Sequence, residues 1–280
     1  MARFRYVVVD VFTNEALAGN QLAVFTDARE IPEAQLQRLA KEMNFSETTF
    51  VYPPENGGHV KMRIFTPGSE LPFAGHPTLG TAFVLAAPLQ LGEIRIETLA
   101  GIVPVRVERE GARIVFGRME QPIPEWGPYA RPEELLPVLG AERSGLPVEV
   151  YHQGPGHIFV ELGSVAEVAA LTPDFPALAR LTPHGAACFA AAGDGWKLRV
   201  FLPAQGIAED PATGSAAGPL ALHLARHGRI AFGDEIEIAQ GAEIGRPSTL
   251  YARVDGSADA VDGMEVGGSA VVVARGEFRL

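Results

Sequence analysis

Cysteine is almost absent from this chain of 280 residues, since Cys188 is the only one. A single thiol excludes an internal disulfide, a cysteine-based metal site and a pair of thiols acting as acid and base. The neighbours of Cys188, in AACFAAA, are small and apolar. We therefore expect it to be a buried strand residue rather than a reactive one.

Charge is also sparse, because charged residues make up 20% of the chain and no run of Lys or Arg interrupts an acidic excess of 34 to 23. This balance argues against nucleic acid or an anionic membrane surface as a partner. No uninterrupted apolar run is long enough to cross a membrane, and the beginning of the sequence, MARFRYVVVDVF, lacks the apolar region of a signal peptide. We expect a cytoplasmic protein whose 47% hydrophobic content can form a large core.

Two segments of the sequence are similar to each other. RIFTPGSELPFAGHPTLGTA (63–82) and RVFLPAQGIAEDPATGSA (199–216) both begin with Arg, an apolar residue, Phe, any residue and Pro. Both end with Pro, Thr, Gly, a hydroxyl residue and Ala, and the second copy is two residues shorter. The alignment places His76 opposite Asp210. A repeat of this kind indicates a duplicated structural unit.

The segments around these motifs follow one order in both halves: a strand, a helix, another strand, the motif turn, a long helix and further strands. Strands are expected near 19–25, 48–53, 93–98, 102–109 and 112–119, and again near 156–162, 186–192, 235–239, 249–255 and 264–274. Helices are expected at 31–43, 77–87, 164–181 and 212–227.

This order predicts an α+β fold of two pseudo-symmetric halves, each a curved, mostly antiparallel, barrel-like sheet around a central helix. The halves are expected at 1–119 and 120–280, with a hinge where prolines cluster near 119–131. The last strand can return to pack on the N-terminal half. Because the two motif turns are equivalent, their helix N-termini are expected to face one cleft and to bind a carboxylate.

Three titratable residues in these segments are candidates for proton transfer. Glu47 lies between a helix and a strand, where partial burial can adapt a carboxylate to acid–base work. His76 precedes Pro77, which suits a first helical position and would put His76 near the N-cap. Asp210 precedes Pro211 in the same way, and Asp is a favoured N-cap. Each residue alone also fits a structural interpretation, as a solvated carboxylate or a cap, but structural capping does not require His in one copy and Asp in the other.

Other motifs indicate little. His223 and His227 are four apart on a helix, yet no Glu-bearing zinc motif accompanies them, so helix-end histidines are the simpler interpretation and no metal is expected. No nucleotide-binding or GxSxG motif is present, and we expect no cofactor. Ser215 has no base next to it in the sequence, so a hydrolase using Ser215 would need one brought within hydrogen-bond reach by the fold.

The segments VDVFTNEALAGNQLAVF, NFSETTFV, RIFTPGSELPFAGHPTLG and GIAEDPATGSAAG resemble, in this order, the signature segments of the PhzF family of phenazine-biosynthesis-like isomerases. The resemblance covers essentially the whole chain and implies the fold of diaminopimelate epimerase. That epimerase uses one cysteine from each half, which the composition here excludes. One departure is Gln21, where the family often has Pro, and this bears on the shape of the substrate.

The resemblance implies a cofactor-independent isomerase, usually dimeric, acting on a small carboxylated substrate. Glu47 would remove a proton from one carbon and return it to another on the same face, with His76 and Asp210 as further catalytic residues. The residues implied in substrate binding are Ser46, Gly75, Gly214 and Ser215. The alternative is a non-catalytic, dimeric member of the same fold that binds a small molecule or a protein.

Overall fold

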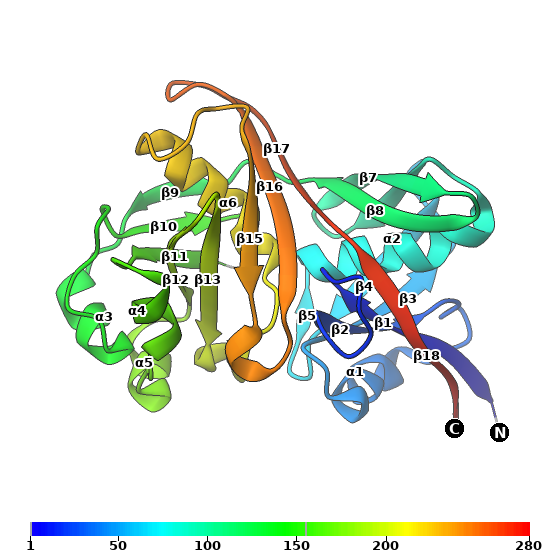
Figure 1. Cartoon of the computed structure of the whole chain (residues 1–280). Helices are drawn as coiled ribbons and strands as arrows, with labels where there is room; N and C mark the ends of the chain where they lie inside the picture. Colours follow the sequence, from blue (N-terminus) through cyan, green and yellow to red (C-terminus); the bar gives the residue numbers. More distant parts are fainter. Residues whose placement is uncertain (1, 155) are drawn as a thin grey trace. The chain divides into compact units, whose positions relative to one another are not determined.

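The computed structural model describes residues 2–154 and 156–280, and the chain divides into two compact units. The first unit comprises residues 1–120 and 267–280, and the second comprises residues 121–266. Each unit is a curved sheet with one long helix packed against it. The last strand of the chain, β18 (Ala270–Arg279), pairs antiparallel with the first, β1 (Arg3–Val11), so both ends of the chain lie together in the first unit (Figure 1).

In the first unit the sheet runs from β1 through β2 (Asn20–Phe25), β3 (Glu47–Tyr52), β4 (Val60–Phe65) and β6 (Glu93–Thr98) to β7 (Gly101–Glu110). The pairs β2–β3 and β4–β6 are parallel and the other three are antiparallel. β8 (Arg113–Glu120) adds an antiparallel partner to β7, and the short β5 (Glu70–Leu71) pairs with β4. The helix α1 (Glu33–Met43) packs on β3 and β4.

The second unit repeats this order of strands. Its sheet runs through β10 (Glu149–His152), β11 (Gly156–Glu161), β12 (Gly185–Ala192), β13 (Gly195–Leu202), β15 (Glu235–Gln240) and β16 (Ser248–Gly256). The sequence of antiparallel and parallel pairs is the same as in the first unit, with β11–β12 and β13–β15 parallel. The prediction of an α+β fold with two pseudo-symmetric halves is therefore confirmed.

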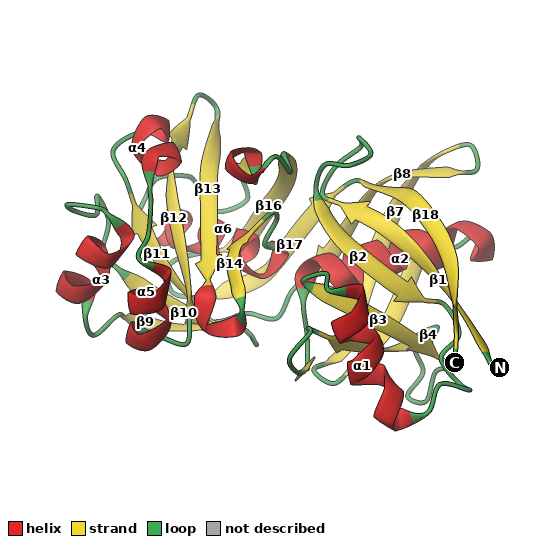
Figure 2. Ribbon diagram, turned by 90° about the horizontal axis from the view of Figure 1, so that it is seen from below, coloured by secondary structure: helices red, strands yellow, loops and turns green. Residues whose placement is uncertain are grey.

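The long helices are central to their units because their sequences are apolar almost all round. α2 (Gly75–Leu89) is buried from Gly75 to Phe83 and contacts β1, β2, β3, β6, β7, β8 and β18. α6 (Gly214–Arg226) is buried from Gly214 to Ala225 and contacts β11 and β16. The smaller helices α3 (Pro132–Leu139), α4 (Val165–Ala170) and α5 (Phe175–Leu181) share a core with β11, β12 and β13, on the side away from α6 (Figure 2).

Several boundaries differ from those expected from the sequence. The helical pattern at 164–181 forms two helices, because Ser164 and Asp174 each accept a backbone N–H of a new first turn. The strand expected at 264–274 is two strands, β17 (Val261–Gly268) and β18, and the proline-rich segment after residue 119 contains β9 (Glu125–Pro128), which pairs with β10. The strand β14 (Ile207–Asp210) and the short helical turns Pro203–Gln205 and Ala242–Ile244 were not predicted.

Cys188 lies in β12 with no exposed surface, and burial raises the pKa of its thiol to about 12. The expectation of a buried strand cysteine is confirmed. Among the residues that the structure describes, no helix has the length and apolar character needed to span a membrane.

Candidate active site

A carboxylate and an imidazole meet in the first unit. Glu47 is the first residue of β3 and His76 is the second residue of α2, and Glu47 Oε2 lies 3.3 Å from His76 Nε2. Both residues are buried, with 9% and 4% of their surface exposed. The fold thus brings together two of the three residues predicted to act in proton transfer.

The other ring nitrogen of His76, Nδ1, lies 3.3 Å from the side-chain nitrogen Nδ2 of Asn20, the first residue of β2. An amide nitrogen only donates, so Nδ1 accepts this hydrogen bond and the ring proton lies on Nε2, facing Glu47. Burial lowers the pKa of His76 to about 3, against a smaller opposite effect of a hydrogen bond with the backbone of Gln21. A neutral imidazole therefore lies beside the Glu47 carboxylate, in a contact of 3.3 Å that lacks the geometry of a hydrogen bond.

The two predicted binding residues of this unit lie beside the pair. Ser46 donates its hydroxyl proton to Asn20 Oδ1 at 3.0 Å, so Asn20 joins Ser46 and His76. Gly75 is the first residue of α2, whose N-cap residue, Ala74, provides no side-chain cap. The helix does not start at Pro77 as predicted but two residues earlier, and so His76 lies within its first turn rather than at the cap.

The second cluster lies where α6 begins. The Thr213 hydroxyl donates to Asp210 Oδ2 at 2.5 Å and accepts a hydrogen bond from Gln240 Nε2 at 2.9 Å. The Gln240 side chain also accepts the Thr213 backbone N–H at 3.0 Å and donates to the Asp210 carbonyl at 2.8 Å. Because all three residues are buried, this closed set of bonds holds the turn before α6 in one conformation.

Asp210 is not the helix N-cap that the sequence suggested. It is the last residue of β14, and the N-cap of α6 is Thr213, whose hydroxyl is bonded to Asp210 instead of capping the helix. Counted from the start of the long helices, His76 corresponds to Ser215, since each is the second helical residue after a glycine. The alignment of His76 with Asp210 was therefore wrong in register, because Gly214 follows Phe201 by 13 positions whereas Gly75 follows Phe65 by 10, so α6 starts later after its strand than α2 does.

Ser215 has a base within hydrogen-bond reach after all. Its Oγ lies 3.0 Å from Nε2 of His157, a residue of β11 that is 1% exposed. Burial, followed by repulsion from His184 and His152, lowers the pKa of His157 to about 3. A group so hard to protonate is a poor general base, and among the described residues no hydrogen-bond partner orients its Nδ1. The pair does not support the hydrolase interpretation.

The repeat also shows why the two clusters differ. Thr48 of β3 pairs with Phe65, and Ala186 of β12 pairs with Phe201, the matching phenylalanine of the second copy. The residues just before them, Glu47 and Gly185, therefore occupy equivalent places. The second unit has a glycine where the first has its carboxylate, and the carboxylate of its cluster, Asp210, comes from the end of β14 and is bonded to Thr213.

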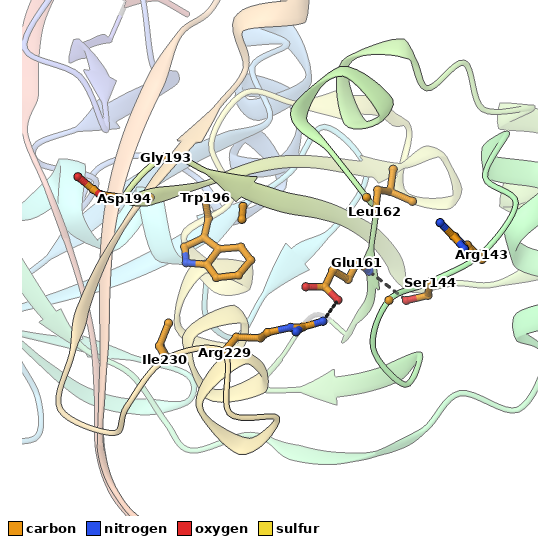
Figure 3. Close-up of a pocket in the computed structure, with 13 residues that line it drawn as sticks. Arg143, Ser144, Glu161, Leu162, Gly193, Asp194, Trp196, Arg229 and Ile230 are labelled. Atoms are coloured by element: carbon orange, nitrogen blue, oxygen red, sulfur yellow. Dashed lines mark hydrogen bonds and ion pairs between the residues drawn. The ribbon is translucent and has the colours of Figure 1, made fainter.

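A cavity of about 730 Å³ in the second unit is a competing location for a ligand (Figure 3). Glu161 and Arg229 in its wall form an ion pair of 2.7 Å and neutralise each other. The described residues that line it include none of the predicted site residues; they are Arg143, Ser144, Gly145, Glu161, Leu162, Gly163, Ala191, Gly193, Asp194, Gly195, Trp196, Arg229 and Ile230. This cavity lacks an uncommitted acid–base pair and is not the candidate site.

His223 and His227 are not simple helix-end histidines. Both donate to Glu149 Oε2, at 3.1 and 3.2 Å, in a geometry that resembles the ligand set of a zinc ion. However, Arg226 Nη1 lies 2.7 Å from the same oxygen, so a guanidinium already supplies the positive charge. Burial raises the pKa of Glu149, but hydrogen bonds outweigh this effect and lower it overall; their donors are His223, Arg226, His227 and Tyr151. We interpret the cluster as a network of hydrogen bonds and ion pairs that links α6 to β10.

Comparisons with known proteins agree with these features. A model of the family described as phenazine biosynthesis-like protein matches residues 9–276. The chain is 51% identical over 276 residues to a trans-2,3-dihydro-3-hydroxyanthranilate isomerase of Pseudomonas aeruginosa, with 99% of each chain covered. A PhzF-family crystal structure from Bacillus anthracis has a TM-score of 0.87 at 26% identity, covering 100% of both chains. A probable proline racemase from Agrobacterium radiobacter, at 11% identity, shares the fold alone, with a TM-score of 0.73 over 99% of this chain and 93% of its own.

The duplicated fold and these matches define the class, which is that of isomerases built from two copies of one α+β unit. The chain belongs to the PhzF family, the phenazine biosynthesis-like proteins. The resemblance found in the motifs is confirmed, and so is the prediction of an isomerase acting on a small molecule. The alternative of a non-catalytic binding protein is not supported.

Proposed function

We propose that this isomerase moves a proton between two carbons of a small carboxylated substrate, with Glu47 as the group that removes and returns it. The observation that carries this proposal is the buried contact of 3.3 Å between Glu47 and the neutral imidazole of His76. With its ring proton on Nε2, His76 would donate to the carboxylate and stabilise its charged form, which is the form that accepts a proton. Both side chains are buried, which restricts their access to water, so the proton can stay on Glu47 until it is returned.

The substrate is proposed to be trans-2,3-dihydro-3-hydroxyanthranilate, the compound in the name of the Pseudomonas aeruginosa relative. Such a compound carries a carboxylate, which the first-turn amides of Gly75 and Gly214 and the hydroxyl of Ser215 are suited to bind. Asp210 is proposed as a second proton-carrying group. A homodimer in the cytoplasm remains the expectation for the assembly and its location.

The test is deuterium uptake by this compound during incubation with the protein in D2O, followed by NMR. We expect substrate-dependent incorporation by the wild-type protein and its loss in Glu47→Gln, which keeps the size and removes the base. Glu42→Gln, on the exposed side of α1, is the matched control and should retain full activity. Incorporation by Glu47→Gln at the wild-type rate would exclude Glu47 as the base. Isomerisation by the wild-type protein without incorporation would indicate direct transfer without exchange, and the rate of product formation would then replace exchange as the measurement for each variant.

A further inference from the structure

One kind of contact occurs at each of the two long helices, α2 and α6. Neither the motifs nor the proposed chemistry explains it. The second residue of each helix is hydrogen-bonded to a side chain at the start of a neighbouring strand. In the first unit Asn20 of β2 bonds His76, and in the second unit His157 of β11 bonds Ser215. Each strand residue directly follows a glycine in the sequence. A contact of this kind therefore occurs in both units, with different chemical groups on both sides of it.

The surroundings of His157 hold its ring in one orientation. The side chain is buried, and β12 has Gly185 directly beside it in the parallel pair β11–β12. A Cβ atom at Gly185 would lie 2.8 Å from His157 Nδ1, so only glycine leaves room for the ring there. Among the described residues Nδ1 has no hydrogen-bond partner, which leaves the bond between Nε2 and Ser215 as the polar contact that offsets the burial of this imidazole.

We propose that His157 is a positioning residue for the substrate-binding Ser215, donating its Nε2–H to Ser215 Oγ so that the hydroxyl proton is directed to the substrate. A serine hydroxyl has one proton and two lone pairs, so only a donor at Nε2 leaves that proton available. If Nε2 were the acceptor, the hydroxyl proton of Ser215 would point at the imidazole. The lone pairs of Ser215 Oγ would then face an anionic substrate, which is unfavourable. The part of this proposal that concerns the carboxylate rests on the proposed function.

Kinetics of four variants test whether His157 acts through Ser215. His157→Leu removes the donor, and we expect KM to rise about tenfold with kcat within about twofold, as for loss of one hydrogen bond to a charged group in ground and transition states alike. His157→Gln places an amide N–H near the position of Nε2 and should recover most of the loss. In the Ser215→Ala background, His157→Leu should have no further effect on KM. A further tenfold rise in that background would overturn the proposal.

The control is His152→Gln, since His152 is an exposed neighbour that does not contact Ser215 by hydrogen bond. Its KM should equal that of the wild type. An increase as large as that of His157→Leu would show that the electrostatic surroundings, rather than the Nε2–H, determine binding, and would contradict the proposal.

A spectroscopic measurement separates this proposal from the proposed function. A long-range ¹H–¹⁵N spectrum of the histidine rings at neutral pH, without substrate, shows which nitrogen of His157 carries the proton. We expect the proton on Nε2 in the wild-type protein, and a proton on Nδ1 would refute the proposed role whatever the activity is. This result does not depend on Glu47 or on the choice of substrate, and it remains decisive if His157→Leu fails to fold.

Discussion

The two buried histidines of the candidate site predict an acid-labile fold whose sensitivity can be assigned to single residues. His76 and His157 are neutral in the folded protein because burial lowers the pKa of each to about 3, while an unfolded chain titrates its histidines near pH 6.5. As the pH falls below about 6.5, these histidines bind protons in the unfolded state but not in the folded state. The stability contributed by each neutral histidine is therefore complete above about pH 6.5 and is lost progressively toward about pH 3.

The magnitude follows from the same pKa values. Each such histidine makes the free energy of unfolding fall by about 1.4 kcal/mol per pH unit, so between pH 6.5 and pH 5 it accounts for about 2 kcal/mol. His157→Gln has no group that titrates in this range. Whatever its stability at pH 7, its loss of stability on going to pH 5 should be about 2 kcal/mol smaller than that of the wild type.

The assay is urea unfolding at several pH values between 5 and 7.5, followed by the fluorescence of Trp126 and Trp196, which both lie in the same unit as His157. Equal slopes for His157→Gln and the wild type would refute the reasoning, because they would mean that His157 is protonated to the same extent in both states.

Three further predictions concern packing and polar contacts elsewhere in the chain. Glu149→Gln should lower stability by about 2–3 kcal/mol in thermal or urea unfolding, because it leaves the Arg226 charge partly buried without its carboxylate, whereas the exposed Glu133→Gln should be neutral. Gly80→Ala should lower stability by about 1–2 kcal/mol, since a Cβ would lie 2.7 Å from the side chains of Leu22 and Val11. The cost of this overpacking exceeds the gain in helix propensity, and a higher Tm would contradict the packing. Cys188 should react with a thiol reagent only after unfolding, and rapid labelling of the native protein would show that β12 opens.

The long-range contacts explain which parts of the site were predictable. The motif turns were found because each is a continuous run of residues, and Glu47 was found through the family motif around it. Asn20 and His157 were missed as functional residues, although each directly follows a glycine near the start of a strand. Their partners lie 56 and 58 positions away in the sequence, and periodicity carries no information about such a contact.

The sequence by itself determined the duplicated architecture of this protein, because burial of an all-apolar helix and the alternation of strands and turns follow from local residue patterns. It also determined the family, through motifs that extend along the whole chain. Only the tertiary structure decided that Glu47 faces a neutral His76, that Asp210 bonds Thr213 instead of capping α6, and that Arg226 supplies the cation beside Glu149. These outcomes depend on distances and desolvation between segments that are remote in the chain, and such quantities exist only once the backbone has folded.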